Sequence, residues 1–311
     1  MMKWNAAIRK PFLMRIWENY PKTWKFMIDV GILVKYKTLN IKKLPKTLTL
    51  PSSTVLYIDS EENRGRALLI SNGVTQKRLD RFWSMAVKKM NPDLVIDVGV
   101  NYGECIFSTQ YSPKTRIIGV EANSRLIPFI EQSKEAHPNR SQIAIYNAIA
   151  SDKDNEKTVF FVDRHWSGTS SATYQPSHKL IDKVPVQSIT IDTLCHDQTY
   201  ETVLFKVDVE GYEAFVLKGM TDLFKTSKSI LGFIEFNSEY FKKLGISVDQ
   251  FLLFLQTYFT IYVYKEDHSL VKAAHYNHMD LKNLFGADYI HTDFLLVSDD
   301  SLIERMHINY V

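Results

Sequence analysis

Short apolar runs alternate with amphipathic stretches over most of the chain, a pattern typical of a parallel sheet covered by helices on both faces. The spacing of apolar residues predicts helices at residues 76–90, 124–136 and 248–258. Strands are predicted at residues 94–96, 116–120, 143–149, 157–162, 183–191, 203–207, 229–236, 259–264 and 294–297. We therefore expect an α/β fold with one large domain and an appendage.

The N-terminal part departs from this pattern. Residues 54–58 and 67–70 have the composition of two short strands around the polar EENRG, which predicts a β-hairpin. Two prolines divide residues 1–50, so two or three brief helices are expected there. We place the domain boundary near residue 75, with a helical segment and hairpin at residues 1–74 and the main domain at residues 75–311.

The stretch LVIDVGVNYGE combines a buried strand with a glycine turn. Asp97 ends the strand, and Gly99 and Gly103 precede a helix predicted to start at Glu104. Glycine tolerates positive φ and lets a ligand approach the backbone. Glu121 ends the next strand, where an acidic residue of a doubly wound sheet faces the ribose of a ligand. The alternative is a turn that needs glycine only for its shape.

Five motifs in sequence order give the chain a resemblance to a known family. DVGVNYG, GVEAN, NAIASD, SITIDTL and KVDVEGYE, between about residues 79 and 237, resemble the FkbM family of S-adenosylmethionine-dependent methyltransferases. The resemblance implies the Rossmann-like class I fold, with a seven-stranded, mostly parallel sheet and one antiparallel strand near its C-terminal end. It also implies O-methylation of a hydroxyl of a sugar, glycan or similar natural product. Val100 stands where the family usually has alanine, and we expect a slightly reshaped loop.

The resemblance further implies which residues bind S-adenosylmethionine. Asp152, or the backbone beside Ala150, is placed next to the adenine, although Asp152 could equally cap a helix or form a turn. The implied cofactor residues are Asp97, Gly99, Asn101, Gly103, Glu121, Asn123, Ala150 and Asp152.

Ionisable side chains that follow the strand at 203–207 are the candidates for proton transfer. Lys206, Asp208 and Glu210 come close to one face at the end where ligands bind in such sheets. Asp208 is the first candidate for the base that accepts the hydroxyl proton, and Glu210 is the second. Lys206 could hold a carboxylate in place, or form a purely structural ion pair with Asp208. His165, in a Gly/Ser loop, could also act as a base or be a packing residue.

A metal site is a further possibility at the same sheet edge. Glu235 and Asn237 share a face of their strand, and Asp208 lies on the neighbouring strand. Together they would supply the oxygen ligands that Mg²⁺ prefers. Alternatively, Glu235 forms hydrogen bonds at the sheet end or contacts the substrate.

Charge is distributed unevenly along the 311 residues. The net charge is +3, but residues 1–50 carry 11 Lys or Arg against two acidic residues, with aromatic residues interleaved. This mixture suits a cap or dimer interface, or peripheral contact with an anionic membrane, for example beside a lipid-linked glycan acceptor. Because no recognition motif accompanies the basic residues, no nucleic acid partner is expected.

Cysteine content bears on the compartment. Cys105 and Cys195 are too few for a disulfide framework, so both are expected as free thiols in a reducing compartment. No apolar segment suits a secretory signal or a membrane span. We expect a cytoplasmic protein, at the inner face of the membrane if residues 1–50 bind lipid.

Two functions compete with methyl transfer. A nicotinamide-dependent oxidoreductase is disfavoured, because Gly99-x-x-x-Gly103 lacks the G-x-G-x-x-G spacing that binds a pyrophosphate. A catalytically inactive scaffold of this fold would act instead through a membrane- or partner-binding N-terminal segment.

Overall fold

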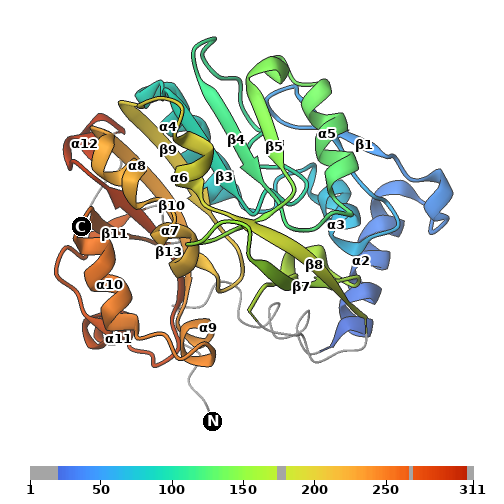
Figure 1. Ribbon diagram of the computed structural model, residues 1–311. Helices are drawn as coiled ribbons and strands as arrows, with labels where there is room; N and C mark the ends of the chain where they lie inside the picture. Colours follow the sequence, from blue (N-terminus) through green and yellow to red (C-terminus); the bar gives the residue numbers. More distant parts are fainter. Residues whose placement is uncertain (1–19, 174–179, 266–268, 307–311) are drawn as a thin grey trace.

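A mostly parallel sheet forms the centre of the structure (Figure 1), a computed structural model that describes residues 20–173, 180–265 and 269–306. Within these residues the central sheet has eight strands. In spatial order they are β12 (Leu270–Lys272), β11 (Thr260–Tyr264), β13 (His291–Val297), β10 (Ser229–Asn237), β9 (Thr202–Val207), β3 (Leu94–Val98), β4 (Arg116–Val120) and β5 (Ile143–Tyr146).

The strand directions match the class I expectation. β5, β4, β3, β9 and β10 pair in parallel, and β13 runs antiparallel to both β10 and β11. The seven predicted strands of the central sheet are therefore present. The short β12, antiparallel to β11 at the sheet edge, is an eighth strand that the sequence analysis did not predict.

Alternating side chains of the central strands pack into two hydrophobic cores, one on each face of the sheet. All five residues of β3 are buried: Val95 packs in one core, and Leu94 and Ile96 pack in the other. This explains why β3 reads as an uninterrupted apolar run. The first core also contains residues of α2 (Pro21–Tyr36), α3 (Asn63–Ser71), α4 (Lys77–Met90), α5 (Ile127–Glu135) and α12 (Ser301–Met306).

Helices on the opposite face complete the second core. They are α6 (Ile191–Cys195), α7 (Glu213–Lys218), α8 (Thr221–Thr226), α9 (Ser238–Lys243), α10 (Val248–Gln256) and α11 (His278–Phe285). The predicted helices at 76–90, 124–136 and 248–258 are confirmed as α4, α5 and α10, with ends that differ by up to three residues. No helix in the described part of the chain is long and apolar enough to cross a membrane.

A second sheet projects from the strand ends. β6 (Ile149–Ala150) pairs in parallel with β8 (Ile181–Ile189), which pairs antiparallel with β7 (Lys157–Asp163). The single strand predicted at 143–149 is thus divided between two sheets. The Asn147 side-chain amide donates hydrogen bonds to the carbonyls of Glu121 (2.8 Å) and Ala122 (3.2 Å), and the chain leaves the central sheet at this point.

The N-terminal prediction was partly wrong. A hairpin is present, but it joins β1 (Thr47–Thr49) to β2 (Val55–Tyr57). Residues 67–70 belong to α3, whose N-terminus is capped by the Glu62 carboxylate accepting a hydrogen bond from Gly65 N at 2.9 Å. Pro21 begins α2 instead of ending a helix, because proline suits the first helical position. Residues 1–19, for which brief helices were also expected, lie outside the described residues.

No helix starts at Glu104, where one was predicted. Residues 104–107 form a turn, and the chain then continues irregularly to β4. Two side-chain hydroxyls bond to backbone carbonyls that would accept from backbone N–H groups in a helix. The Ser108 hydroxyl donates to Cys105 O at 2.7 Å, and the Tyr111 hydroxyl donates to Ile106 O at 2.7 Å. Cys105 is a buried free thiol in this turn, and Cys195 is a buried free thiol as well.

Candidate active site

A cavity of about 700 Å³ opens at the carboxyl ends of β3, β4, β9 and β10. Its size is that of a small-molecule site, and its position is where open α/β sheets bind ligands. The glycine turn after β3 lines one end, and acidic residues after β9 and β10 line another. Trp24 of α2 and Arg64 of α3 line it from the N-terminal part of the chain.

The glycine turn brings backbone to the cavity wall. Gly99 has φ +80° and Gly103 has φ +88°, and a Cβ on Gly99 would lie 2.0 Å from the carbonyl oxygen of Asp208. Only glycine fits this close approach between the ends of β3 and β9. Asn101, between the two glycines, also has a positive φ of +53°. Gly99 and Asn101 line the cavity, whereas Gly103 shapes the turn behind it.

Glu121 and the glycine turn form one unit. The Glu121 carboxylate accepts hydrogen bonds from Asn101 N at 2.7 Å and from Asn123 N at 2.8 Å. Glu121 lines the cavity, and each carboxylate oxygen retains acceptor capacity for a ligand hydroxyl. Burial raises the pKa of Glu121, against the effect of the two backbone donors. Asn123 is itself buried, with its side chain accepting from Arg125 N at 3.2 Å.

Lys206 on β9 forms hydrogen bonds to the end of β3 and to the glycine turn. Its ammonium donates to Asp97 Oδ1 at 3.1 Å and to the carbonyl of Gly99 at 3.0 Å, and lies 3.8 Å from Asp208 Oδ2. Burial alone would lower the pKa of Lys206, but the charges of Asp97 and Asp208 together raise it above its ordinary value. Lys206 therefore remains a cation. Asp97 is fully buried beneath the cavity wall as its partner.

Three carboxylates meet at the other end of the cavity. Asp208, Glu210 and Glu235 each place an oxygen within 4.8 Å of the others. The Tyr240 hydroxyl donates to Glu210 Oε2 at 2.8 Å, and His291 Nε2 lies 2.8 Å from Glu235 Oε1. Glu210 has the strained φ of +52°, the backbone conformation of the turn residue before Gly211. We name Asp208, Glu210 and Glu235 the acidic cluster.

Burial and neighbouring negative charge shift Glu210 and Glu235 toward protonation. Burial raises the pKa of Glu210 well above its ordinary value, and the charges of Glu235 and Asp208 raise it further. Burial and then Asp208 raise the pKa of Glu235, while His291 opposes the shift.

Of the predicted metal ligands, Asp208 and Glu235 lie together, with Glu210 beside them. Asn237 lies outside the acidic cluster, because its side-chain oxygen caps α9 by accepting from Glu239 N at 3.1 Å. Its amide nitrogen donates to the Tyr289 hydroxyl at 3.3 Å. Glu210 takes the third place, next to Asp208 and Glu235.

His165 does not occupy the position expected of a base. It is buried behind the cavity wall, with Nδ1 3.0 Å from the Asn63 amide nitrogen and its backbone N–H donating to Asp163 at 2.7 Å. The next residues, from Trp166 to Ser170, line the cavity in its place. The packing alternative is thus the one that the geometry favours.

The predicted adenine residues lie at different depths. Ala150 lines the cavity together with Ile149 and Phe160, whereas Asp152 does not. Asp152 instead accepts a hydrogen bond from the Ser151 hydroxyl at 3.3 Å. A role in cofactor binding therefore stays a prediction for Asp152, as it does for the buried Asn123.

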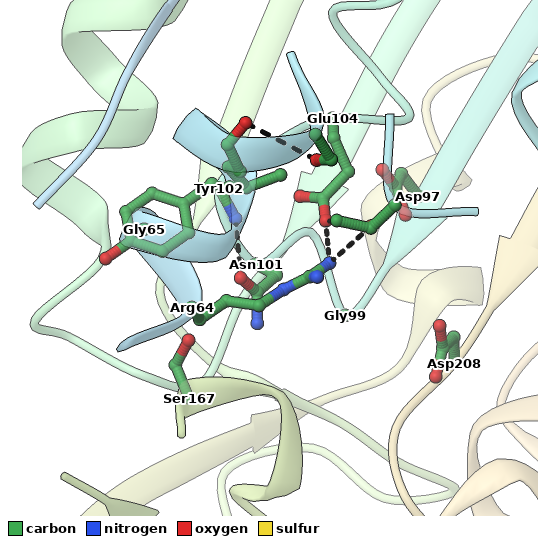
Figure 2. A network of polar contacts seen from close by, with 12 residues as sticks. Arg64, Gly65, Asp97, Gly99, Asn101, Tyr102, Glu104, Ser167 and Asp208 are labelled. Carbon is green, nitrogen blue, oxygen red and sulfur yellow. Dashed lines mark hydrogen bonds and ion pairs between the residues drawn. The ribbon is translucent and has the colours of Figure 1, made fainter. Parts of the chain in front are cut away.

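Arg64 is a cavity residue that the sequence analysis missed. Figure 2 shows its side chain extended toward Glu104, beside the glycine turn. The guanidinium pairs with Glu104, donates to Thr75 Oγ1 at 3.1 Å and lies 5.6 Å from the ring centroid of Trp166. Arg64 belongs to the EENRG segment, which was assigned to a hairpin loop, so no motif pointed to it.

The family model described as "Methyltransferase FkbM domain" matches residues 97–265, more than half of the chain. The match contains the glycine turn, Glu121 and the acidic cluster, and it begins after Arg64. A search of the curated proteins finds no match.

Distant likenesses to solved structures accompany the family match. Methyltransferase FkbM from Methylobacillus flagellatus KT is 12% identical with a TM-score of 0.39, over 66% of this chain and 44% of that chain. An O-methyltransferase from Bacillus cereus, in complex with S-adenosylhomocysteine, is 10% identical with a TM-score of 0.40, over 89% and 99%. TomG from Streptomyces achromogenes, in complex with S-adenosylmethionine, is 6% identical with a TM-score of 0.41, over 75% and 86%.

This chain thus aligns with less than half of the Methylobacillus protein, and the family assignment depends on the domain match alone. That match covers the β3 turn, the end of β4 and the acidic ends of β9 and β10, which line the cavity together with residues of the preceding helices. The chain belongs to the FkbM family of S-adenosylmethionine-dependent methyltransferases.

Proposed function

We propose that this protein transfers a methyl group from S-adenosylmethionine to a hydroxyl oxygen of a sugar or glycan. One observation carries the proposal: a single cavity joins the glycine turn and Glu121 to the acidic cluster. A cofactor site and a set of proton acceptors then lie in one space, as transfer to a hydroxyl requires.

The residues at the glycine turn fit the cofactor. Gly99 keeps side-chain atoms away from the cavity wall, and Glu121 can accept hydrogen bonds from ribose hydroxyls. Ala150, Ile149 and Phe160 offer an apolar surface for a purine ring. We assign Arg64 to the carboxylate of the methionine portion, because it is the cation of α3 that faces this end of the cavity.

The acidic cluster is assigned to the acceptor. When bound, S-adenosylmethionine supplies a methyl group already activated by its sulfonium, so the protein has to orient the acceptor hydroxyl and remove one proton. Asp208 lies nearest the glycine turn and is our first candidate to accept that proton. Glu210 and Glu235 adjoin it, and Lys206 orients Asp208 as a fixed cation.

A polyhydroxyl acceptor agrees with the lining of the cavity. Ser167, Thr169 and Ser170 line the cavity together with the carboxylates of the acidic cluster. Hydroxyl and carboxylate groups are suitable partners for sugar hydroxyls. This composition is the support for a sugar or glycan over an apolar acceptor.

Proton transfer, and not metal binding, is the role we propose for the acidic cluster. Three carboxylates could supply oxygen ligands to Mg²⁺. Two of them, however, already bond Tyr240 and His291, and Asn237 is turned away. Activity is therefore expected to survive EDTA. Activity lost in EDTA and restored by Mg²⁺ would assign the acidic cluster to a metal ion.

Labelled S-adenosylmethionine and a panel of mono- and oligosaccharides provide the test. We expect label in a sugar, with turnover reduced roughly 10²- to 10⁴-fold by Asp208→Asn while S-adenosylhomocysteine still binds. Glu201→Gln, an exposed carboxylate before β9 at the far end of the sheet, is the matched control and should be unchanged. If Asp208→Asn transfers the label as fast as wild type, the assigned base is wrong. If no sugar accepts label, the acceptor class is wrong.

A further inference from the structure

Helix α2 has two apolar faces, and only one of them is covered by the residues that the structure describes. Trp24, Ile28 and Ile32 recur every four residues and are buried in the core beside α3. This face makes α2 a cap on the main domain, one of the roles expected for the basic segment. Trp24 and Ile28 also line the cavity.

The opposite face of α2 is apolar and exposed. Phe26 is 66% exposed, Val30 44%, Leu33 45% and Val34 64%. The spacing i, i+4, i+7 and i+8 places these side chains in one stripe along the helix. We call Phe26, Met27, Val30, Leu33 and Val34 the outer stripe of α2.

Exposed apolar residues are concentrated here. Of the 11 exposed large hydrophobic side chains in the described residues, seven lie between Tyr20 and Leu39. Single exposed apolar residues are normal on any protein surface, but a contiguous patch marks an interaction site. The outer stripe is such a patch.

Exposed lysines lie at both ends of the outer stripe and in the segment that follows it. Lys22 and Lys37 lie at the two ends of α2, and Lys42, Lys43 and Lys46 follow in the next turn and hairpin, all exposed. Within the described residues none of these five lysines forms an ion pair. The one acidic residue of α2, Asp29, is bonded to Lys25 at 2.6 Å and to Arg66. The outer stripe is therefore flanked along the chain by lysines without acidic partners among the described residues.

We propose that the outer stripe of α2 binds the surface of a lipid bilayer that contains anionic lipids. Apolar side chains of an interfacial helix enter the headgroup boundary, and lysines beside them attract lipid phosphates. A second copy of this chain fits less well, because a two-fold interface would bring the same lysines together. Charge complementarity thus selects the membrane as the partner.

The arrangement has a consequence for the acceptor. Because α2 lines the cavity with Trp24 and Ile28, membrane binding would hold the cavity one helix away from the lipid surface. A lipid-linked acceptor could then reach it without leaving the bilayer. This consequence rests on the proposed function, whereas membrane binding itself does not.

Vesicle flotation with the full-length chain tests the proposal without using activity. We expect binding to vesicles of phosphatidylcholine with roughly 30% phosphatidylserine, and little binding to phosphatidylcholine alone. Replacing Phe26, Val30 and Leu33 together by Gln should weaken binding roughly tenfold or more, because their apolar area no longer enters the boundary. The variant Lys42→Gln, Lys43→Gln, Lys46→Gln should weaken it similarly, as should high salt.

The control removes exposed apolar groups elsewhere. Leu253 on α10 is 65% exposed and Met279 on α11 is 60% exposed, so Leu253→Gln with Met279→Gln should bind like wild type. The proposal is overturned if wild type does not float with anionic vesicles, or if the α2 variants float equally well. It is also overturned if light scattering shows a wild-type dimer that the Phe26, Val30 and Leu33 variant converts to a monomer.

Discussion

The three neighbouring carboxylates of the acidic cluster determine the proton chemistry that we propose for the cavity. Glu210 and Glu235 are held near Asp208 by the end of β9 and the end of β10, and burial disfavours their charged forms. A carboxyl group with a raised pKa can accept a proton near neutral pH, which an ordinary carboxylate does poorly. The raised pKa makes Glu210, the second candidate for the base, a stronger proton acceptor once it is ionised.

The pH dependence of methyl transfer follows from these shifts. A carboxyl with a raised pKa stays protonated to higher pH, so turnover that depends on the ionised form of Glu210, the second candidate for the base, should rise with pH above the ordinary carboxylate range. Glu235→Gln removes one negative neighbour and lowers the pKa of Glu210, which should move this rise to lower pH. The profile of kcat against pH for wild type, Glu235→Gln and Glu201→Gln is the measurement. An unmoved profile, or one moved to higher pH, contradicts the coupling.

The buried Glu213 should make the free energy of unfolding depend on pH. Its carboxylate accepts hydrogen bonds from Val209 N at 3.2 Å and Gly211 N at 3.1 Å, and burial raises its pKa from 4.5 to about 8. A carboxyl with a raised pKa stabilises the fold below its unfolded-state pKa, and this contribution is lost as pH rises through about 8.

We therefore expect Glu213→Gln, which keeps an acceptor oxygen, to reduce the loss of unfolding free energy between pH 5 and pH 9 by on the order of 2 kcal/mol. Urea unfolding at several pH values measures this difference. Equal pH dependence in wild type and variant would show that Glu213 titrates normally.

Helix α4 shows how an element is attached to the sheet. Arg78 on α4 donates to the carbonyl of Tyr264 on β11 at 2.7 Å and pairs with Asp293 on β13. Arg78→Met leaves the buried Asp293 carboxylate without its cation, so it should lower the free energy of unfolding by about 3–5 kcal/mol. Arg81→Met, an exposed position on the same helix, should change it by less than about 0.5 kcal/mol. Equal losses in the two variants would contradict this role of the buried pair.

Helices and strands with a regular spacing of hydrophobic residues could be predicted from the sequence. Segments whose conformation depends on side-chain hydrogen bonds could not. β4 was predicted at its observed bounds, and α4 within one residue, because burial on defined faces imposes the pattern. Residues 67–70 were assigned to a strand because the capping of α3 by Glu62 is not visible in an apolar run. The turn after Gly103 was assigned to a helix for the same reason, since the hydrogen bonds from the Ser108 and Tyr111 hydroxyls to nearby carbonyls leave no mark in the hydrophobic pattern.

The site residues that follow directly after neighbouring strands of the sheet could be predicted from the sequence. The ends of β3, β4, β9 and β10 lie side by side in any class I sheet, so Gly99, Glu121, Asp208 and Glu235 could be expected in one cleft. The direction of a side chain was not fixed in this way: Asn237 turned to cap α9, and His165 lies behind the wall. Arg64 enters from α3 through packing of distant segments, which no local pattern encodes.

Over the whole molecule, the cavity is the feature on which the functional account depends. It combines residues of the FkbM domain with Trp24, Ile28 and Arg64 from the preceding helices. The N-terminal segment is therefore part of the site wall as well as a basic, apolar surface. A protein truncated before residue 75 would lack both.

Calorimetric titration with S-adenosylhomocysteine measures binding at the cofactor site without turnover, because this product cannot transfer a methyl group. Ala148 lines the cavity beside β6, so Ala148→Trp should block the site, while the exposed Ser141→Trp is a matched bulky control. We expect roughly micromolar binding to wild type and Ser141→Trp, at least about tenfold weaker binding to Ala148→Trp, and no binding of NADH. Folded wild-type protein that does not bind S-adenosylhomocysteine, or binds it equally well in both variants, would contradict the assignment of this cavity to the cofactor.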